Sequence, residues 1–211
     1  MDVQQDFCEG GTLAVAGGAA IAVAVSEYVA ANRDSYALIA ASRDSHAPAS
    51  DNGGHFGATP DYVVTWPRHC VAGTRGAEHH PDLHLPAGTI DIAKGDGSPA
   101  YSAFEGVDPV SGKMLEDVLA DNDVDELDVC GIATDYCVKA TALDAVAAGF
   151  ATRVLTGLVV GVAPATTLAA LDEMAAAGVV FSEEGPAARA GSEAISSGQD
   201  AWTQAAMRGG G

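Results

Sequence analysis

Short apolar segments and longer helical segments alternate along most of the chain. Continuously apolar or alternating runs predict strands at residues 36–41, 89–93, 126–132, 152–156 and 178–182. Apolar residues at helical spacing predict helices at residues 18–32, 113–122, 137–148 and 164–177. Short strands joined by longer helices are typical of crossover connections within a parallel sheet. The pattern therefore predicts a doubly wound α/β domain.

Two segments do not follow this alternation. Residues 42–88 are rich in His, Asp, Gly and Pro with little periodicity, and an irregular segment of that length in a compact domain is usually functional. The residues after about position 185 are small and polar and end in three glycines. We therefore predict one folded domain at residues 1–185 and a low-complexity C-terminal tail at residues 186–211.

Composition narrows the class of protein. The chain has 211 residues, of which 48% are hydrophobic, so one domain with a well-buried core is expected. A formal charge of −19 with only ten basic residues argues against nucleic-acid binding, which needs a basic surface. We find neither a long apolar run nor a basic leader before an apolar stretch, so we expect no membrane association and a cytoplasmic location.

The cysteines are candidates for chemistry. Cys8, Cys70, Cys130 and Cys137 show no CxxC spacing, so we expect reduced thiols. Cys137 follows the predicted strand at 126–132 and opens a helix, where the helix dipole and backbone N–H groups lower a thiol pKa and can hold an oxyanion. The alternative is that Cys137 is a small core residue, as we expect for Cys130 inside the strand.

A carboxylate and three imidazoles lie in the irregular segment. Asp44 and His46 are two residues apart, so they point the same way if the chain is extended there, and His55 and His69 follow. This donor set suits a divalent transition ion better than Ca²⁺ or Mg²⁺. The alternative is that these histidines are solvated, which we expect of His79, His80 and His84.

Three further charged residues stand near predicted strand ends or the amino end of the chain: Lys94, Asp2 and Asp6. Each alone is most simply a surface charge. A carboxylate, a cation and a thiol at the ends of separate parallel strands could nevertheless meet in one cleft.

Several motifs together resemble a known family. DVQQDFCEGG, RDSH with the later HF, TPDY and WPRHC, AKGDGSPAYSAFEG and GIATDYCV occur in order between Asp2 and Val138. They resemble bacterial nicotinamidases, also called pyrazinamidases, of the isochorismatase-like cysteine hydrolases. The resemblance implies a three-layer α/β/α fold with a doubly wound, mainly parallel sheet. It also implies hydrolysis of nicotinamide, and of pyrazinamide, to the acid and ammonia through a cysteine thioester, in NAD salvage.

The resemblance implies roles for individual residues. The catalytic set is Asp2, Lys94 and Cys137, with the N–H groups of Ala133 and Cys137 as the oxyanion hole. A cis peptide is implied between Ile132 and Ala133. One Zn, Fe or Mn ion is held by Asp44, His46, His55 and His69. The substrate pocket is formed by Phe7, Leu13, Trp66, Tyr101 and Ala133, with Tyr136 as a further candidate.

Two features depart from the family pattern. A hydrophobic strand normally leads into the catalytic Asp, whereas only Met1 precedes Asp2 here, so we expect a truncated first strand and a poorly held Asp2. The segment between His46 and His55 is a few residues longer. Alternative functions are an amidase for a carbamoyl or ureido compound and a non-catalytic metal-binding scaffold. Oligomeric state stays open between a monomer and a small homo-oligomer.

Overall fold

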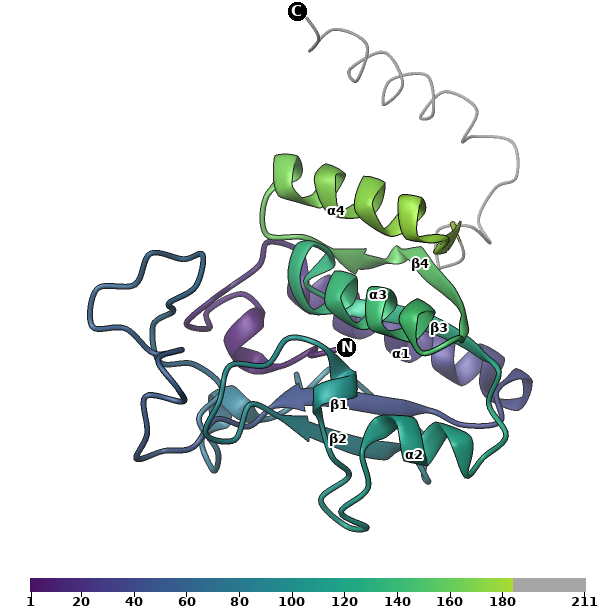
Figure 1. Cartoon of the computed structure of the whole chain (residues 1–211), viewed down its shortest axis with the longest axis horizontal. Coiled ribbons are helices and arrows are strands. Elements are labelled where there is room, and N and C mark those ends of the chain that lie inside the picture. Colours follow the sequence, from purple (N-terminus) through teal and green to yellow (C-terminus); the bar gives the residue numbers. More distant parts are fainter. Residues whose placement is uncertain (184–211) are drawn as a thin grey trace, which may run out of the picture.

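Within the part of the chain that the structure describes, five parallel strands form two sheets. The computed structural model describes residues 1–183, so the predicted tail at 186–211 lies outside the described residues. β1 (Ala40–Asp44) pairs with β2 (Ile90–Lys94), and β3 (Glu126–Ile132), β4 (Ala151–Val160) and β5 (Val180–Ser182) form the other sheet in that order (Figure 1). The predicted parallel α/β architecture is confirmed.

Helices cover both faces of the larger sheet. Their bounds are α1, Gly18–Asn32; α2, Leu115–Ala120; α3, Lys139–Ala147; and α4, Pro164–Ala177. Leu155 of β4 packs against α1, whereas its neighbour Val154 packs in the cluster that contains residues of α3 and α4. Successive strand residues point to opposite faces, so α1 lies on one face and α3 and α4 lie on the other (Figure 1). Within residues 1–183, none of the helices has the length and apolar character needed to cross a membrane.

The helices follow the sequence pattern closely. α1 and α4 have the predicted bounds, and α4 begins with Pro164 at its first turn and ends at Gly178, whose φ of 99° is left-handed. α3 is preceded by a π-helical turn over Thr134–Val138, which contains Cys137. The predicted helix at 137–148 is therefore present, and Cys137 lies at its entry.

β1 differs from the prediction. We expected a strand at 36–41, but β1 spans Ala40–Asp44, paired in register with β2. The second half of β1 consists of polar residues, so the hydrophobic pattern of the sequence does not indicate a strand there. Pairing with β2 makes these residues part of the strand. Tertiary pairing overrides a local pattern in this way often.

The two sheets meet along a seam between β1 (Ala40–Asp44) and β3 (Glu126–Ile132), which belong to separate sheets. Met1 and Asp2 lie between the carboxyl halves of these strands. The Met1 ammonium donates to the Cys130 carbonyl at 2.7 Å, and the Met1 carbonyl accepts from the Ile132 N–H at 3.0 Å. On the other side, the Asp2 N–H donates to the Ser42 carbonyl at 3.1 Å. These two residues thus join the sheets only at the carboxyl half of the seam, in the hydrogen-bond pattern of a parallel strand.

Three cavities border the seam in the described residues, and the two smaller ones extend to Met1 and Ser42 at its carboxyl half. Their volumes are about 510, 110 and 110 Å³, and Ala40 of β1 and Asp128 of β3 line all three. The largest also reaches Tyr36 and Arg153, at the amino ends of the strands. The sheet is therefore divided at this seam, with unfilled space beside it.

Candidate active site and metal centre

The three predicted catalytic side chains meet at the carboxyl ends of the strands. Lys94 Nζ, at the end of β2, lies 3.0 Å from Asp2 Oδ2 and 3.7 Å from Cys137 Sγ. All three residues are buried. Asp2 is 1% exposed, and its Oδ1 accepts a 2.7 Å hydrogen bond from the Ser42 hydroxyl. The expectation that Asp2 would be poorly held is therefore wrong, because the Ser42 hydroxyl and the Lys94 ammonium hold its carboxylate in place.

The charges of this group depend on burial and on its neighbours. Burial lowers the pKa of Lys94, but Asp2 and Asp44 outweigh this effect and raise that pKa well above its usual value, so the ammonium form persists. Burial raises the pKa of the Cys137 thiol well above its usual value; Lys94 lowers it, while both carboxylates raise it. We expected a lowered thiol pKa from the helix entry, and burial outweighs that contribution. A neutral thiol needs a base at the moment of attack, and Asp2 is the adjacent carboxylate.

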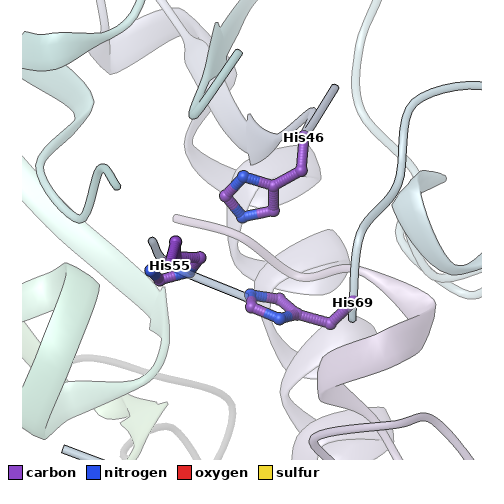
Figure 2. A group of neighbouring side chains, drawn as sticks. All are labelled: His46, His55 and His69. Atoms are coloured by element: carbon purple, nitrogen blue, oxygen red, sulfur yellow. The ribbon is translucent and has the colours of Figure 1, made fainter. Parts of the chain in front are cut away.

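The three predicted metal-binding histidines form one cluster. Ring nitrogens of His46, His55 and His69 all lie within 4.8 Å of one another, and Figure 2 shows the three rings converging. Asp44 Oδ2 lies 3.7 Å from His46 Nε2 and 3.8 Å from His69 Nε2. All four residues are buried. Neither His79, His80 nor His84 belongs to the cluster; His84 is exposed as expected, whereas the other two are half-buried.

The cluster fits a transition-metal ion. His46 Nε2 and His55 Nδ1 are buried without a hydrogen-bond partner, as expected of atoms that should bind an ion. Burial, aided by the other histidines, lowers the pKa of His55 to about 4, which favours the neutral ring that binds a metal. His46 Nδ1 contacts the Gly95 carbonyl and His69 Nδ1 the Pro67 carbonyl, each at 2.8 Å. Such contacts orient the opposite ring nitrogen toward an ion.

Lys94 connects the two groups. Its ammonium contacts the Asp44 carboxylate as well as that of Asp2. Burial raises the pKa of Asp44, but Lys94 and His46 outweigh it and hold that pKa well below the usual value. The metal cluster and the catalytic group are therefore parts of one buried charge network.

A pocket of about 320 Å³ opens onto both groups. Trp66 Nε1 donates to the Tyr101 hydroxyl at 2.9 Å, and the Tyr101 and Tyr136 rings stack at 6.1 Å between centroids. Asp44, His55, His69 and Cys137 also line the pocket. The structure thus brings together every residue predicted for substrate binding: Phe7, Leu13, Trp66, Tyr101, Ala133 and Tyr136.

The loop after β3 contains the predicted backbone feature. The peptide bond between Ile132 and Ala133 is cis. Ala133 and Cys137 both line the pocket, so the two residues predicted to form an oxyanion hole lie at its wall. Their role as N–H donors to a substrate stays a prediction.

Comparison with known proteins places the chain in a family. Residues 1–184 match the isochorismatase domain. The chain belongs to this family. It is 53% identical to the nicotinamidase/pyrazinamidase of Mycobacterium tuberculosis over 179 residues, which cover 85% of this chain and 94% of that protein.

Solved structures of isochorismatase-like proteins resemble it closely. The pyrazinamidase of Pyrococcus horikoshii in complex with zinc is 37% identical, with a TM-score of 0.74 over 87% of this chain and 96% of that one. PnC1 from L. infantum in complex with nicotinate is 33% identical, with a TM-score of 0.71 over 86% of this chain and 88% of that one. This isochorismatase-family chain therefore shares its fold with one protein solved in complex with zinc and another solved in complex with nicotinate.

Sequence reasoning missed the residues that support the site. The fully buried Gln4 side chain pairs with both backbone groups of Asp44, each at 2.8 Å, in place of a neighbouring strand. Asp6 accepts from the Cys70 N–H at 2.7 Å and so holds the chain beside His69 rather than joining the catalytic group. The buried Asp135 accepts from the Val162 N–H at 2.9 Å at the start of α4. The alternating DVQQD motif is the one available signal for Gln4.

Proposed function

We propose that this protein is a nicotinamidase that hydrolyses nicotinamide, and also pyrazinamide, to the corresponding acid and ammonia. The observation that carries the proposal is the meeting of Asp2 and Cys137 within 3.7 Å of the Lys94 nitrogen. Cys137 lines an aromatic pocket whose wall also includes His55 and His69 of the histidine cluster. The similarity to nicotinamidases over most of the chain supports it.

The residues suggest a division of labour in the reaction. Asp2 takes the proton of the Cys137 thiol as the sulfur attacks the carboxamide carbon, and the Lys94 ammonium, 3.0 Å from Asp2 Oδ2, holds that carboxylate in place. The N–H groups of Ala133 and Cys137 hold the oxyanion of the tetrahedral intermediate. Asp2 then returns the proton to the departing amine, which leaves as ammonia and a thioester remains. A water molecule hydrolyses the thioester to nicotinate and regenerates the thiol.

The metal-binding residues orient the substrate in this proposal. Asp44, His46, His55 and His69 would hold one divalent ion, Zn, Fe or Mn, which supplies a Lewis acid for the pyridine nitrogen. Trp66, Tyr101 and Tyr136 provide flat apolar surfaces against which a six-membered aromatic ring packs. A substrate held in this orientation would react faster, because its amide carbon lies next to the Cys137 sulfur.

We further propose a cytoplasmic enzyme of NAD salvage, since nicotinate is a precursor that such a pathway recycles. The four cysteines, all free, fit a reducing compartment. A rival reading within the family is hydrolysis of a carbamoyl or ureido compound. The aromatic walls of the pocket favour a heteroaromatic amide over these smaller groups, which have no aromatic ring to stack.

Ammonia release tests the proposal directly. Purified full-length protein supplied with Zn²⁺, Fe²⁺ or Mn²⁺ is assayed with nicotinamide, pyrazinamide and a carbamoyl amino acid. We expect release from the two aromatic amides. Cys137→Ala should abolish ammonia release while keeping the metal bound. Cys130 lies in the body of β3 and supplies the matched control, Cys130→Ala, which should retain ammonia release. Activity on the carbamoyl compound alone supports the rival, and no release from any substrate supports a non-catalytic scaffold and contradicts the enzyme.

A further inference from the structure

The segment between His46 and His55 is organised around one buried amide. Asn52 is 0% exposed although it lies in an irregular loop. Its Oδ1 accepts from the Ala47 N–H at 2.8 Å, and its Nδ2 donates to the Ala47 carbonyl at 3.3 Å and the Ser50 carbonyl at 3.4 Å. Its own carbonyl accepts from the His55 N–H at 3.2 Å. The residue that closes this loop is therefore hydrogen-bonded directly to the backbone of a predicted metal ligand.

The same amide ties the loop to the turn after β2. Asn52 Oδ1 also accepts from the Gly97 N–H at 3.0 Å, three residues beyond Lys94. Beside it, the Gly95 carbonyl contacts His46 Nδ1 at 2.8 Å. A Cβ atom at position 95 would lie 2.6 Å from the His46 ring, so this turn is packed directly against that histidine. The turn at 95–97 thus supports His46 through a carbonyl and His55 through Asn52.

The backbone at Asn52 limits what can replace it. Its φ of 53° is left-handed, a conformation that Asn, Asp and Gly adopt more readily than other residues. Glycine therefore keeps the backbone conformation and removes only the side chain, whereas aspartate keeps the two acceptor contacts and loses the donor. Comparing these two substitutions shows how much the side-chain hydrogen bonds of Asn52 contribute, without adding backbone strain at position 52.

We propose that Asn52 is a positioning residue for the metal centre, which holds His55 at the correct place relative to His46 and the end of β2. The inference rests on the proposed metal site but not on the identity of the substrate. Residues that orient metal ligands typically contribute about 10- to 100-fold to metal affinity. A residue that served only to stabilise the loop would change thermal stability and leave metal affinity unaltered.

Zinc affinity of the full-length protein tests the proposal, measured by competition with a chromophoric chelator. We expect Asn52→Gly to weaken zinc binding about 10- to 100-fold and Asn52→Asp to weaken it less. Asn122→Ala is the matched control, because Asn122 Nδ2 donates to the Val118 carbonyl near the end of α2, away from the site. Circular dichroism of the metal-free proteins checks folding, and Asn52→Asp carries the test if Asn52→Gly does not fold.

A double-mutant cycle with His55→Ala tests the route of the effect. If Asn52 acts through His55, Asn52→Gly should weaken zinc binding far less in the His55→Ala background than in the wild type. Wild-type zinc affinity in both Asn52 variants, or an equal loss in Asn122→Ala, would overturn the inference, as would full additivity in the cycle. If the wild-type protein binds zinc but releases no ammonia, the proposed function is contradicted, and weaker zinc binding by the Asn52 variants would still support the role of Asn52.

Discussion

The two halves of the seam between β1 and β3 are built in different ways. At the carboxyl half, Met1 and Asp2 hydrogen-bond to both strands, and the catalytic side chains gather there. Beside the amino half lies the largest of the three cavities, which Ala40 of β1 and Glu126 of β3 line and which neither Met1 nor Asp2 reaches. The difference teaches that the position of Asp2 depends on Ser42 and Lys94 rather than on a continuous sheet.

This comparison implies that the two halves respond differently to mutation. Changes at the carboxyl half should affect chemistry and metal binding. Changes at the amino half should affect the free energy of unfolding and leave the chemistry nearly unaltered, because no catalytic group contacts that half.

The largest effect is expected at Asp2. Asp2→Asn removes the carboxylate that accepts the thiol proton, so we expect kcat for nicotinamide to fall by about 10²- to 10⁴-fold. Asp128→Asn, at the other half of the same seam, is the control and should keep kcat within a fewfold of the wild type. Equal kcat values for the two variants would show that the halves do not differ as described. Steady-state ammonia release measures both.

A ligand substitution should have the next largest effect. His69→Ala removes one member of the buried histidine cluster, so we expect zinc affinity to fall by more than the roughly 100-fold that loss of a supporting residue causes. Metal content after dialysis, measured by mass spectrometry, reports the loss. The exposed His84 supplies the control variant, His84→Ala, which should retain the wild-type stoichiometry. Full zinc occupancy in His69→Ala would remove His69 from the ligand set.

Filling the amino half of the seam should stabilise the protein. A six-residue apolar strand fused before Met1 would bury side chains in the cavities and pair with both strands, which we expect to add about 2–3 kcal/mol after the cost of ordering it. For a domain of this size, that gain raises Tm by about 4–10 °C. The same extension with two prolines, which cannot pair, should raise Tm little. Indistinguishable melting curves for the two extensions would show that the seam does not accept a strand.

The smallest effect is expected from an ion pair beside the largest cavity. Burial raises the pKa of Asp128, but hydrogen bonds from Arg153 and Tyr36 outweigh it and lower that pKa. A carboxyl whose pKa is lower in the folded state stabilises the protein at pH values above its unfolded-state pKa of about 3.9. This stabilisation is lost as the pH falls through the folded-state pKa. Because Asp128 is only half-buried, Asp128→Asn should cost about 1 kcal/mol at pH 7.

Urea unfolding at pH 7 and at pH 2.5 tests this pH dependence. The difference between Asp128→Asn and the wild type should shrink at the lower pH, because the stability that a lowered carboxyl pKa contributes is lost progressively below the unfolded pKa. A difference that grows on acidification would have the wrong sign for a lowered pKa and would assign the effect to packing instead.

The sequence predicted some parts of this molecule much better than others. α1 and α4 were predicted with their bounds because their apolar residues follow helical spacing and Pro164 and Gly178 mark ends of α4. Cys137 and the histidine cluster were found because their residue types and positions after strands are local signals.

What the sequence could not predict depends on contacts between distant segments. β1 was misplaced because pairing with β2 defines Ser42–Asp44 as strand. Gln4 was missed because its importance comes from Asp44, forty residues away. The direction of the thiol pKa was wrong because burial and two carboxylates around Cys137 are properties of the folded protein.

Lys94 gives the site a further property. Its single ammonium is the shared counter-ion of two buried carboxylates, Asp2 and Asp44. When Asp2 becomes neutral by accepting a proton, its negative charge no longer offsets that of the ammonium, so the electrostatic potential at Asp44 becomes more positive. Proton transfer at the thiol is therefore felt electrostatically at the histidine cluster without any movement of the backbone.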